Sequence, residues 1–204
     1  MLNKNDKFKG IDMDKVVKVN FDEHISVAIK TQKELTEKIY EIGIELSNSL
    51  IAGGTIFWCG NGGSAGDSQH IAAELVGRFK GNRKPLRSIA LTTDTSVISC
   101  IANDYSYDEV FSRQIEGLAR EGDILVVIST SGNSKNILHA VQQAKKQGIK
   151  TIGLFGCDGG DGLRQVDLSI IIPSYSTARI QEMHILIGHI FCEIIESELN
   201  LESK

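Results

Sequence analysis

The chain of 204 residues has few cysteines and prolines and no excess of basic residues. Its four cysteines are widely spaced and include no CxxC pair, a distribution that fits neither a zinc finger nor a disulfide framework. They are Cys59, Cys100, Cys157 and Cys192. Such cysteine usage is typical of a reducing compartment, so we expect free thiols and a cytoplasmic location.

Long hydrophobic runs are also missing. The longest nearly apolar stretch, Ile185–Cys192, is interrupted by Gly188 and His189 and is too short to span a bilayer. The first 20 residues are polar and lack the apolar core of a signal peptide. The net charge of −4 argues against a nucleic-acid partner, because phosphate neutralisation needs clustered Lys and Arg. We therefore expect no membrane or nucleic-acid partner, whereas small anionic substrates remain possible.

Apolar strands alternate with helical segments along most of the chain. Residues 1–20 are expected to form a loose N-terminal arm, and residues 21–204 suit a single domain with a full core. Apolar residues then recur at helical spacing from Leu35 to Leu50, and Gly53-Gly54 ends that helix. Strands are predicted at 55–59, 88–91, 124–128, 151–155 and 168–172, and helices at 64–77, 95–102, 108–120 and 134–147. This order predicts a parallel, doubly wound α/β sheet.

A final helix is predicted over residues 178–199. Apolar side chains cover most of its circumference, from Ile180 and Met183 to Ile194 and Ile195. A helix that is apolar nearly all round has to be buried, and an interface between subunits is a natural place for it.

Loops that follow the strands carry the candidate chemistry, because open α/β sheets bind ligands beyond the carboxyl ends of their strands. The loop 60–64 (GNGGS) lets the backbone approach a ligand at a helix N-terminus. The loop 129–134 (STSGNS) places four hydroxyls and a glycine at the start of another helix. We interpret it as a phosphate cradle without a lysine; no G-K-[ST] follows, so it is not a Walker A loop. The glycine-rich, acidic loop 156–160 is interpreted as a flexible turn.

The first loop also satisfies the loose dinucleotide fingerprint G-x-G-x-x-A. That fingerprint requires an acidic residue about 20 positions further on, and the nearest candidate, Asp94, lies well beyond that distance. An NAD-binding enzyme is therefore the weaker hypothesis.

His70 and Glu74 lie four residues apart on the helix that follows the first loop, so they share one helical face. An isolated pair of this kind is usually a solvent-exposed pair, but its position directly after a glycine loop favours a functional role. The final helix carries Gln181, Glu182, His184 and His189 in an otherwise apolar stretch and poses the same question.

Four segments together resemble the phosphoheptose (sedoheptulose 7-phosphate) isomerases, a branch of the sugar isomerase (SIS) superfamily. They are GNGGSAGDSQHIAAELVGRF, IANDY, STSGNS and RIQEMHILIGHI, and the likeness extends from about residue 25 to the C-terminus. The resemblance implies a flavodoxin-like three-layer αβα sandwich with a five-stranded parallel sheet and extra N- and C-terminal helices. It also implies a homotetramer with active sites at subunit junctions.

The resemblance implies roles for individual residues as well. One divalent metal ion per subunit, usually zinc, would be held by His70, Glu74, Gln181 and His189. Contacts to the sugar phosphate would come from Asn61, Gly62, Gly63, Glu74, Asn103, Asp104, Ser129, Thr130, Ser131, Ser134 and Gln181. Glu74 and His189 match the acid/base pair of the family. Isomerisation needs such a pair, because a proton leaves one carbon, an enediolate is stabilised, and the proton returns to the neighbouring carbon.

Helix geometry leaves one choice open. Gln181 and His189 are separated by about 12 Å along a helix axis, so His184, at i+3 from Gln181, is the easier partner. The resemblance favours His189. A second class of function also stays open, because some SIS proteins, such as the DnaA initiator-associating protein, act by protein contacts or bind sugar phosphates without catalysis. Glu74 discriminates between these classes, because a binding module needs no carboxylate there.

Overall fold

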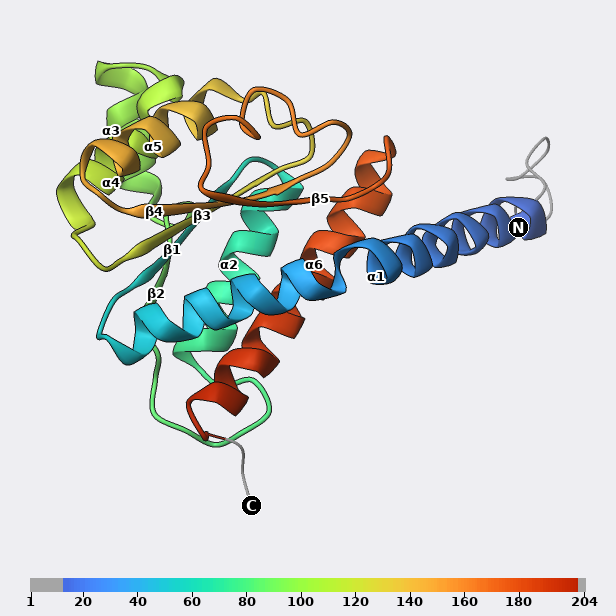
Figure 1. The fold of residues 1–204 in the computed structure, drawn as a ribbon. Coiled ribbons are helices and arrows are strands. Elements are labelled where there is room, and N and C mark those ends of the chain that lie inside the picture. The colour runs from blue at the N-terminus through green and yellow to red at the C-terminus, as the bar shows by residue number, and fades with distance from the viewer. Residues whose placement is uncertain (1–12, 202–204) are drawn as a thin grey trace, which may run out of the picture.

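Five parallel strands form the centre of the protein in a computed structural model that describes residues 13–201 (Figure 1). The strands lie side by side in the order β2-β1-β3-β4-β5. Their bounds are β1 Ile56–Gly60, β2 Ser88–Ala90, β3 Ile124–Ser129, β4 Lys150–Phe155 and β5 Leu168–Ile171. The five predicted strands and their parallel arrangement are therefore confirmed.

Helices cover both faces of this sheet (Figure 1). One layer contains α1 (Met13–Ile51), α2 (Gly63–Val76) and α6 (Thr177–Glu198). The other contains α3 (Thr95–Asp104), the short 3-10 helix η2 (Tyr107–Glu109), α4 (Ser112–Leu118) and α5 (Lys135–Lys146). The predicted three-layer αβα sandwich, with additional helices at both ends of the chain, is confirmed.

The central strand β3 shows why its sequence is a continuous apolar run. Val126 and Ile128 pack in the cluster formed with α1, α2 and α6, whereas Leu125 and Val127 pack in the cluster on the opposite face. Successive side chains of a strand point to opposite faces, so a strand covered by helices on both sides has to be apolar at every position.

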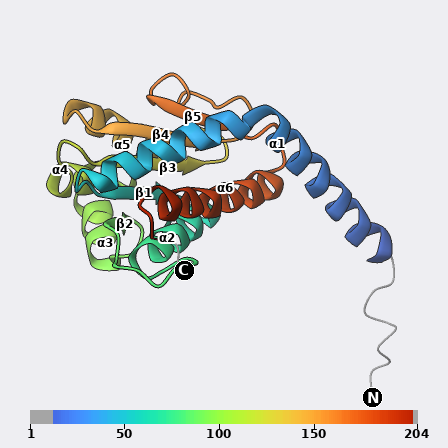
Figure 2. The ribbon, with the colours of Figure 1, turned by 60° about the horizontal axis from the view of Figure 1, so that its bottom comes forward.

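The N-terminal arm predicted for residues 1–20 is wrong from residue 13 onward, because α1 begins there. No proline or glycine interrupts residues 13–42, so nothing in that stretch breaks the helix. Its first turns project from the body of the protein and expose Val16, Val19 and Phe21 (Figure 2). Residues 1–12 lie outside the described residues, and the assignment of 21–204 to a single domain stays a prediction.

The helix predicted over residues 108–120 is divided into η2 and α4. The Ser112 hydroxyl hydrogen-bonds both the backbone carbonyl and the carboxylate of Glu109, at 3.1 and 2.5 Å. A serine that bonds nearby backbone groups competes with helical pairing, which accounts for the break.

Among the helices of residues 13–201, none combines the length and the hydrophobicity that a membrane span requires.

Asp123 joins the starts of two neighbouring strands. Its carboxylate accepts hydrogen bonds from the backbone N–H of Thr55 at 2.7 Å and of Arg120 at 2.8 Å, and the residue is buried. We expect Asp123→Ala to lower the free energy of unfolding by about 2–4 kcal/mol, because two N–H groups lose a charged acceptor.

Urea unfolding followed by circular dichroism measures this loss. Asp94→Ala is the matched control, since the exposed Asp94 only caps α3 through the Val97 N–H and should cost about 1 kcal/mol. Equal losses for the two variants would contradict the role assigned to Asp123.

Candidate active site

The hydroxyl-rich loop after β3 lines a small cavity. Ser129, Thr130, Ser131 and Ser134 contribute to the wall of this cavity of about 70 Å³, together with Asn61, Ser64, Ile128 and Gln181. Ser134 is the N-cap residue of α5, but its side chain makes no capping hydrogen bond. Its hydroxyl and the N-terminal N–H groups of α5 are thus available to an anion, as expected of a phosphate cradle.

The glycine-rich loop 156–160 supports the hydroxyl loop. A Cβ atom on Gly160 would lie 2.4 Å from the Ser131 carbonyl oxygen, and one on Gly132 would lie 2.0 Å from the Gly159 carbonyl oxygen. The Asn133 side chain also accepts a hydrogen bond from the Asp161 N–H at 2.9 Å. The interpretation of this loop as a flexible turn missed these contacts, which connect segments about 30 residues apart.

The loop after β1 forms the neighbouring wall. Gly62 has a φ of 56°, a conformation that favours glycine, and a Cβ atom on Gly63 would lie 2.5 Å from Nε2 of Gln181. Asn61 exchanges two side-chain hydrogen bonds with Asn136 at 2.9 Å, and its Oδ1 accepts a third from the Tyr107 hydroxyl at 3.1 Å. The sequence analysis missed Asn136 and Tyr107, since neither belongs to a motif that points to Asn61.

Three side chains from α2 and α6 meet one another. His70 Nε2 lies 3.2 Å from Glu74 Oε1 and 3.1 Å from His189 Nε2. One donor atom from each of the three lies within 4.8 Å of the others, so the set could hold a metal ion. The cluster confirms that His70 and Glu74 share a face, and it brings His189 to His70, which lies 119 residues away in sequence.

The close approach of the two helices depends on Gly188. A Cβ atom at this position would lie 2.6 Å from the side chain of Ile71. Because Gly188 and Ile71 precede and follow the two histidines of the cluster, their contact determines how close the imidazoles lie.

His184 occupies a different environment. It is buried, and its Nε2 lies 3.1 Å from the Phe155 carbonyl oxygen, which can only accept a hydrogen bond. Burial lowers the pKa of His184 to about 4, with the Phe155 carbonyl opposing the shift, so the ring is neutral at pH 7. Helix geometry alone favoured His184 as the partner of Gln181 in the site, but the structure does not place it there, because the His184 ring faces the core.

Gln181 lies at the cavity end of the site. It lines the hydroxyl cavity and packs over Gly63, two helical turns before His189 on α6. No contact joins its side chain to the three clustered donors, so its place in the ligand set stays a prediction.

Asn103 and Asp104 do not line the cavity. Both are exposed in the last turn of α3, where Asn103 Nδ2 donates to Asp104 Oδ1 at 2.8 Å. Their expected contacts with the sugar stay predictions. Asp94, the acidic residue considered for NAD binding, is occupied as the N-cap of α3.

Asp67 is a further titratable group that the sequence analysis missed. It lies one turn before His70 on α2, and burial raises its pKa to about 6, with the charge of His70 opposing the shift. Its spacing of three residues from His70 could have indicated that the two side chains are neighbours, because residues at i and i+3 lie next to each other on a helix.

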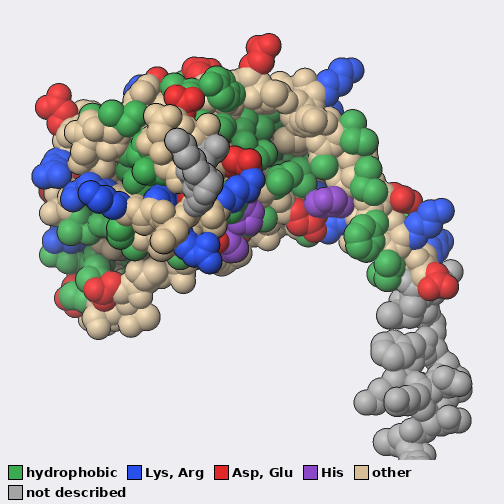
Figure 3. All heavy atoms as spheres, turned by 90° about the horizontal axis from the view of Figure 1, so that it is seen from below, with side chains coloured by type: hydrophobic (Ala, Val, Ile, Leu, Met, Phe, Trp, Pro, Cys, Tyr) green, Lys and Arg blue, Asp and Glu red, His purple; other side chains and the backbone are tan. Residues whose placement is uncertain are grey.

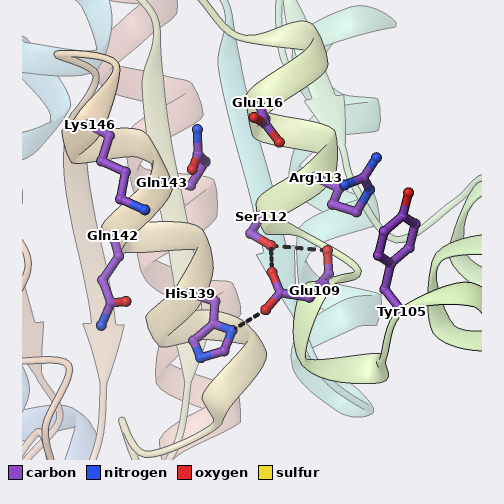
Figure 4. A pocket seen from close by; sticks show the side chains of 9 residues that line it. All are labelled: Tyr105, Glu109, Ser112, Arg113, Glu116, His139, Gln142, Gln143 and Lys146. Carbon is purple, nitrogen blue, oxygen red and sulfur yellow. Dashed lines mark hydrogen bonds and ion pairs between the residues drawn. The ribbon is translucent and has the colours of Figure 1, made fainter.

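A second polar cavity of about 460 Å³ lies between α4 and α5 (Figure 4). In it, His139 Nδ1 lies 2.8 Å from a Glu109 carboxylate oxygen, and Ser112 bonds the same carboxylate. This cavity is larger than the one at the hydroxyl loop, but it is lined by none of the residues predicted to bind metal or substrate or to act in catalysis. Size alone therefore does not identify the candidate site.

The sequence profile of the SIS domain family matches residues 21–156. A phosphoheptose isomerase of Nitratiruptor sp. is 53% identical over 85% of this chain and 93% of its own length. The solved phosphoheptose isomerase GmhA of Neisseria gonorrhoeae has a TM-score of 0.86 and 42% identity, over 90% of this chain and 98% of its own. That of Francisella tularensis has a TM-score of 0.89 and 37% identity, over 92% and 99%.

The chain belongs to the SIS domain family and, within that family, to the phosphoheptose isomerases. It is therefore an enzyme of the isomerase class. The comparisons give no support to a non-catalytic role.

The buried, neutral His184 predicts a dependence of stability on pH. The unfolded chain takes up a proton near pH 6.5 and the folded chain only near pH 4, so the unfolded state binds more protons between these values. The contribution of His184 to stability is thus complete above about pH 6.5 and falls, by about 3 kcal/mol in total, as the pH drops towards 4.

Urea unfolding of wild type and His184→Gln at several pH values measures the contribution of His184 to the free energy of unfolding. Gln keeps a donor for the Phe155 carbonyl but does not titrate. The difference in unfolding free energy between the two proteins should therefore change across pH 4–6.5 and be constant above it. A difference that stays constant over the whole range would show that His184 titrates normally.

Proposed function

We propose that this protein converts D-sedoheptulose 7-phosphate to D-glycero-D-manno-heptose 7-phosphate for heptose biosynthesis. The observation that carries the proposal is the His70–Glu74–His189 cluster, which combines candidate metal ligands with candidate acid/base groups. Its two helices also border the hydroxyl-lined cavity, since α2 begins at the glycine loop and α6 carries Gln181. The names of the relatives support the same reaction.

The phosphate of the substrate would bind at the hydroxyl loop. Hydroxyls of Thr130 and Ser134 and the N-terminus of α5 offer donors to its oxygens, without a lysine. Binding energy gained at this remote end positions the reacting carbons. Asn61, Gly62, Gly63, Asn103, Asp104 and Gln181 are the residues we propose for the sugar.

Glu74 and His189 would then carry the proton transfers. In our proposal, Glu74 removes the proton from C1 of the ketose and returns it to C2, while His189 serves the hydroxyl oxygens that exchange a proton. Glu74 is only partly exposed, with 27% of its side chain accessible, whereas His70 is 48% exposed. Restricted access to water around this carboxylate would limit side reactions of the enediolate.

The donor set fits a divalent metal ion. Zinc–nitrogen and zinc–oxygen bonds of about 2.0–2.2 Å at tetrahedral angles place neighbouring donors about 3.3–3.6 Å apart. The separations of 3.1 and 3.2 Å within the cluster are slightly shorter than that range. We propose that His70, Glu74, Gln181 and His189 hold one such ion per subunit, with zinc the best match to these ligands. When bound, it would polarise the carbonyl and stabilise the enediolate.

We further propose that the protein is a cytoplasmic homotetramer with active sites at subunit junctions. An apolar groove of about 560 Å³ runs between α1 and α6, lined by residues such as Ile29, Tyr40 and Leu186. Hydrophobic side chains also continue along the projecting part of α1 (Figure 3). Other copies of the chain would cover these surfaces, because monomers rarely expose so much apolar area. The four unpaired cysteines suit a reducing compartment.

Incubation with sedoheptulose 7-phosphate in deuterated water, followed by NMR, tests the reaction. With Zn²⁺ supplied, we expect an aldoheptose 7-phosphate to form, and exchange of the abstracted proton with solvent should place deuterium at C1 or C2. Absence of both would refute the enzymatic proposal. Glu74→Gln should retain the sugar phosphate but lower kcat by about 10²–10⁴-fold, because it lacks the base.

The matched control is Glu193→Gln on α6. Glu193 is an exposed carboxylate that pairs with Lys80 at 2.6 Å and has no place in the proposed reaction. The Glu193→Gln variant should leave kcat unchanged. If Glu74→Gln kept the wild-type kcat, Glu74 would not be the base.

Assembly is tested by Phe21→Glu, which places a charge on the projecting part of α1. Phe21 is 64% exposed in the single chain. We expect light scattering to show a smaller species than wild type, with loss of isomerase activity, since burying an unpaired charge at an interface is unfavourable. Leu118→Glu, at a 57% exposed position on α4, is the control and should leave the mass unchanged. Wild-type mass and activity for Phe21→Glu would remove this part of α1 from the interface.

A further inference from the structure

The segment between α2 and β2, residues 77–87, is attached to the end of α6 (Figure 1). The Glu196 carboxylate accepts hydrogen bonds from the backbone N–H groups of Phe79 at 3.2 Å, Lys80 at 3.0 Å and Gly81 at 3.0 Å. Successive N–H groups that converge in this way form an anion-binding nest, here filled by a carboxylate of the same chain. Residues 79–81 therefore have a defined position relative to α6.

Arg83 connects this segment to both helices of the candidate site. Its Nε donates to Glu196 Oε1 at 2.7 Å. Its two terminal nitrogens donate to the carbonyl oxygens of Leu75 and Glu74, each at 2.8 Å. One guanidinium thus joins α6 to the turn of α2 that carries Glu74.

The ion pair between these residues is buried. The side chains of Arg83 and Glu196 are 1% and 2% exposed. Burial alone would raise the pKa of Glu196, but the N–H of Gly81 and the Arg83 guanidinium hold it below its usual range. Buried ion pairs add little net stability compared with apolar packing, so a fully bonded pair here favours one particular geometry instead.

The geometry selected by this pair places Phe79 against His189. The two rings are stacked, with centroids 5.6 Å apart and planes inclined by 16°. His189 also meets His70 in an edge-on arrangement, with centroids 4.9 Å apart and planes inclined by 68°. The imidazole of His189 thus contacts two rings: it stacks on Phe79, and its Nε2 lies 3.1 Å from His70 Nε2.

We propose that Phe79 is a positioning residue, held by Glu196 and Arg83, which keeps the His189 imidazole in the orientation that the metal ion and the proton transfers require. The inference rests on the proposed function. Phe79 is partly buried and also packs against the core cluster, so its stacking on His189 has to be separated from apolar packing. A flat ring is what confines an imidazole by stacking, and groups that orient metal-binding histidines typically contribute 10–100-fold to affinity or activity.

Two substitutions at Phe79 separate stacking from apolar packing. Phe79→Leu keeps an apolar side chain but removes the flat ring, whereas Phe79→Tyr keeps the ring. For Phe79→Leu we expect Co²⁺ affinity, measured spectroscopically by titration, and kcat each to fall about tenfold. KM should change little, because the proposed phosphate cradle contains no residue of the segment 77–87. Phe79→Tyr should stay within about twofold of wild type in all three quantities.

Thermal unfolding distinguishes the positioning role from a purely structural role of Phe79. A purely structural role would lower the Tm of Phe79→Leu without a selective loss of Co²⁺ affinity. Wild-type affinity and kcat for Phe79→Leu, or equal losses for both variants, would overturn the proposal. Crystal structures of wild type and Phe79→Leu without metal provide a readout independent of the proposed function. We expect one His189 ring orientation in wild type and several in the variant.

The two proposals therefore fail in different ways. Wild-type protein that binds no Co²⁺, combined with disorder of His189 in Phe79→Leu, would remove the metal site but retain the positioning role. A single wild-type orientation of His189 in Phe79→Leu would overturn the positioning role.

Glu196→Gln, which weakens the anchoring of Phe79, should also lower Co²⁺ affinity. In the double variant Glu196→Gln/Phe79→Leu, the loss of affinity should be smaller than the product of the two single losses, because the two residues act through one contact. Independent, multiplying factors would contradict the proposed chain of contacts.

Discussion

The approach of α2 to α6 is the constraint on which the candidate site depends. At Gly188 a side chain as small as a methyl group would overlap the Ile71 side chain, so any larger residue there would force Ile71 or the helices to shift. That contact brings a histidine of one helix to a histidine and a carboxylate of the other. Interiors are close-packed, so a shift of one helix would move its ligands by a similar amount.

The parallel sheet supplies the second half of the site. Strands β1 and β3 are parallel neighbours. The glycine loop after β1 and the hydroxyl loop after β3 therefore lie side by side at the carboxyl edge of the sheet. The cavity between them borders the start of α2 and Gln181 of α6. In the proposed function, the phosphate would bind at the start of this helix pair, and the metal and acid/base groups lie nearer the middle of both helices.

Some predictions depended on local patterns and could be made without a structure. The i, i+4 spacing of His70 and Glu74, the loop STSGNS and the apolar strands all result from periodicity or from residues adjacent in sequence. Predictions across the chain were weaker. Helix geometry alone preferred His184 over His189, because it counts residues along one axis and contains no information about the neighbouring helix. The polar N-terminal residues were assigned to an arm for a similar reason, although residues 13–20 extend a helix.

Local sequence patterns specify the order of strands and helices along the chain and the chemical character of two loops. These are properties of short segments, where backbone preference and apolar spacing act between near neighbours. Packing between helices, seen in the tertiary structure, places His184 in the core and His189 beside His70. The tertiary structure alone also brought Phe79, Arg83 and Glu196 to the cluster, although Glu196 follows Phe79 by 117 residues. Such contacts depend on packing between distant segments, and no local pattern specifies them.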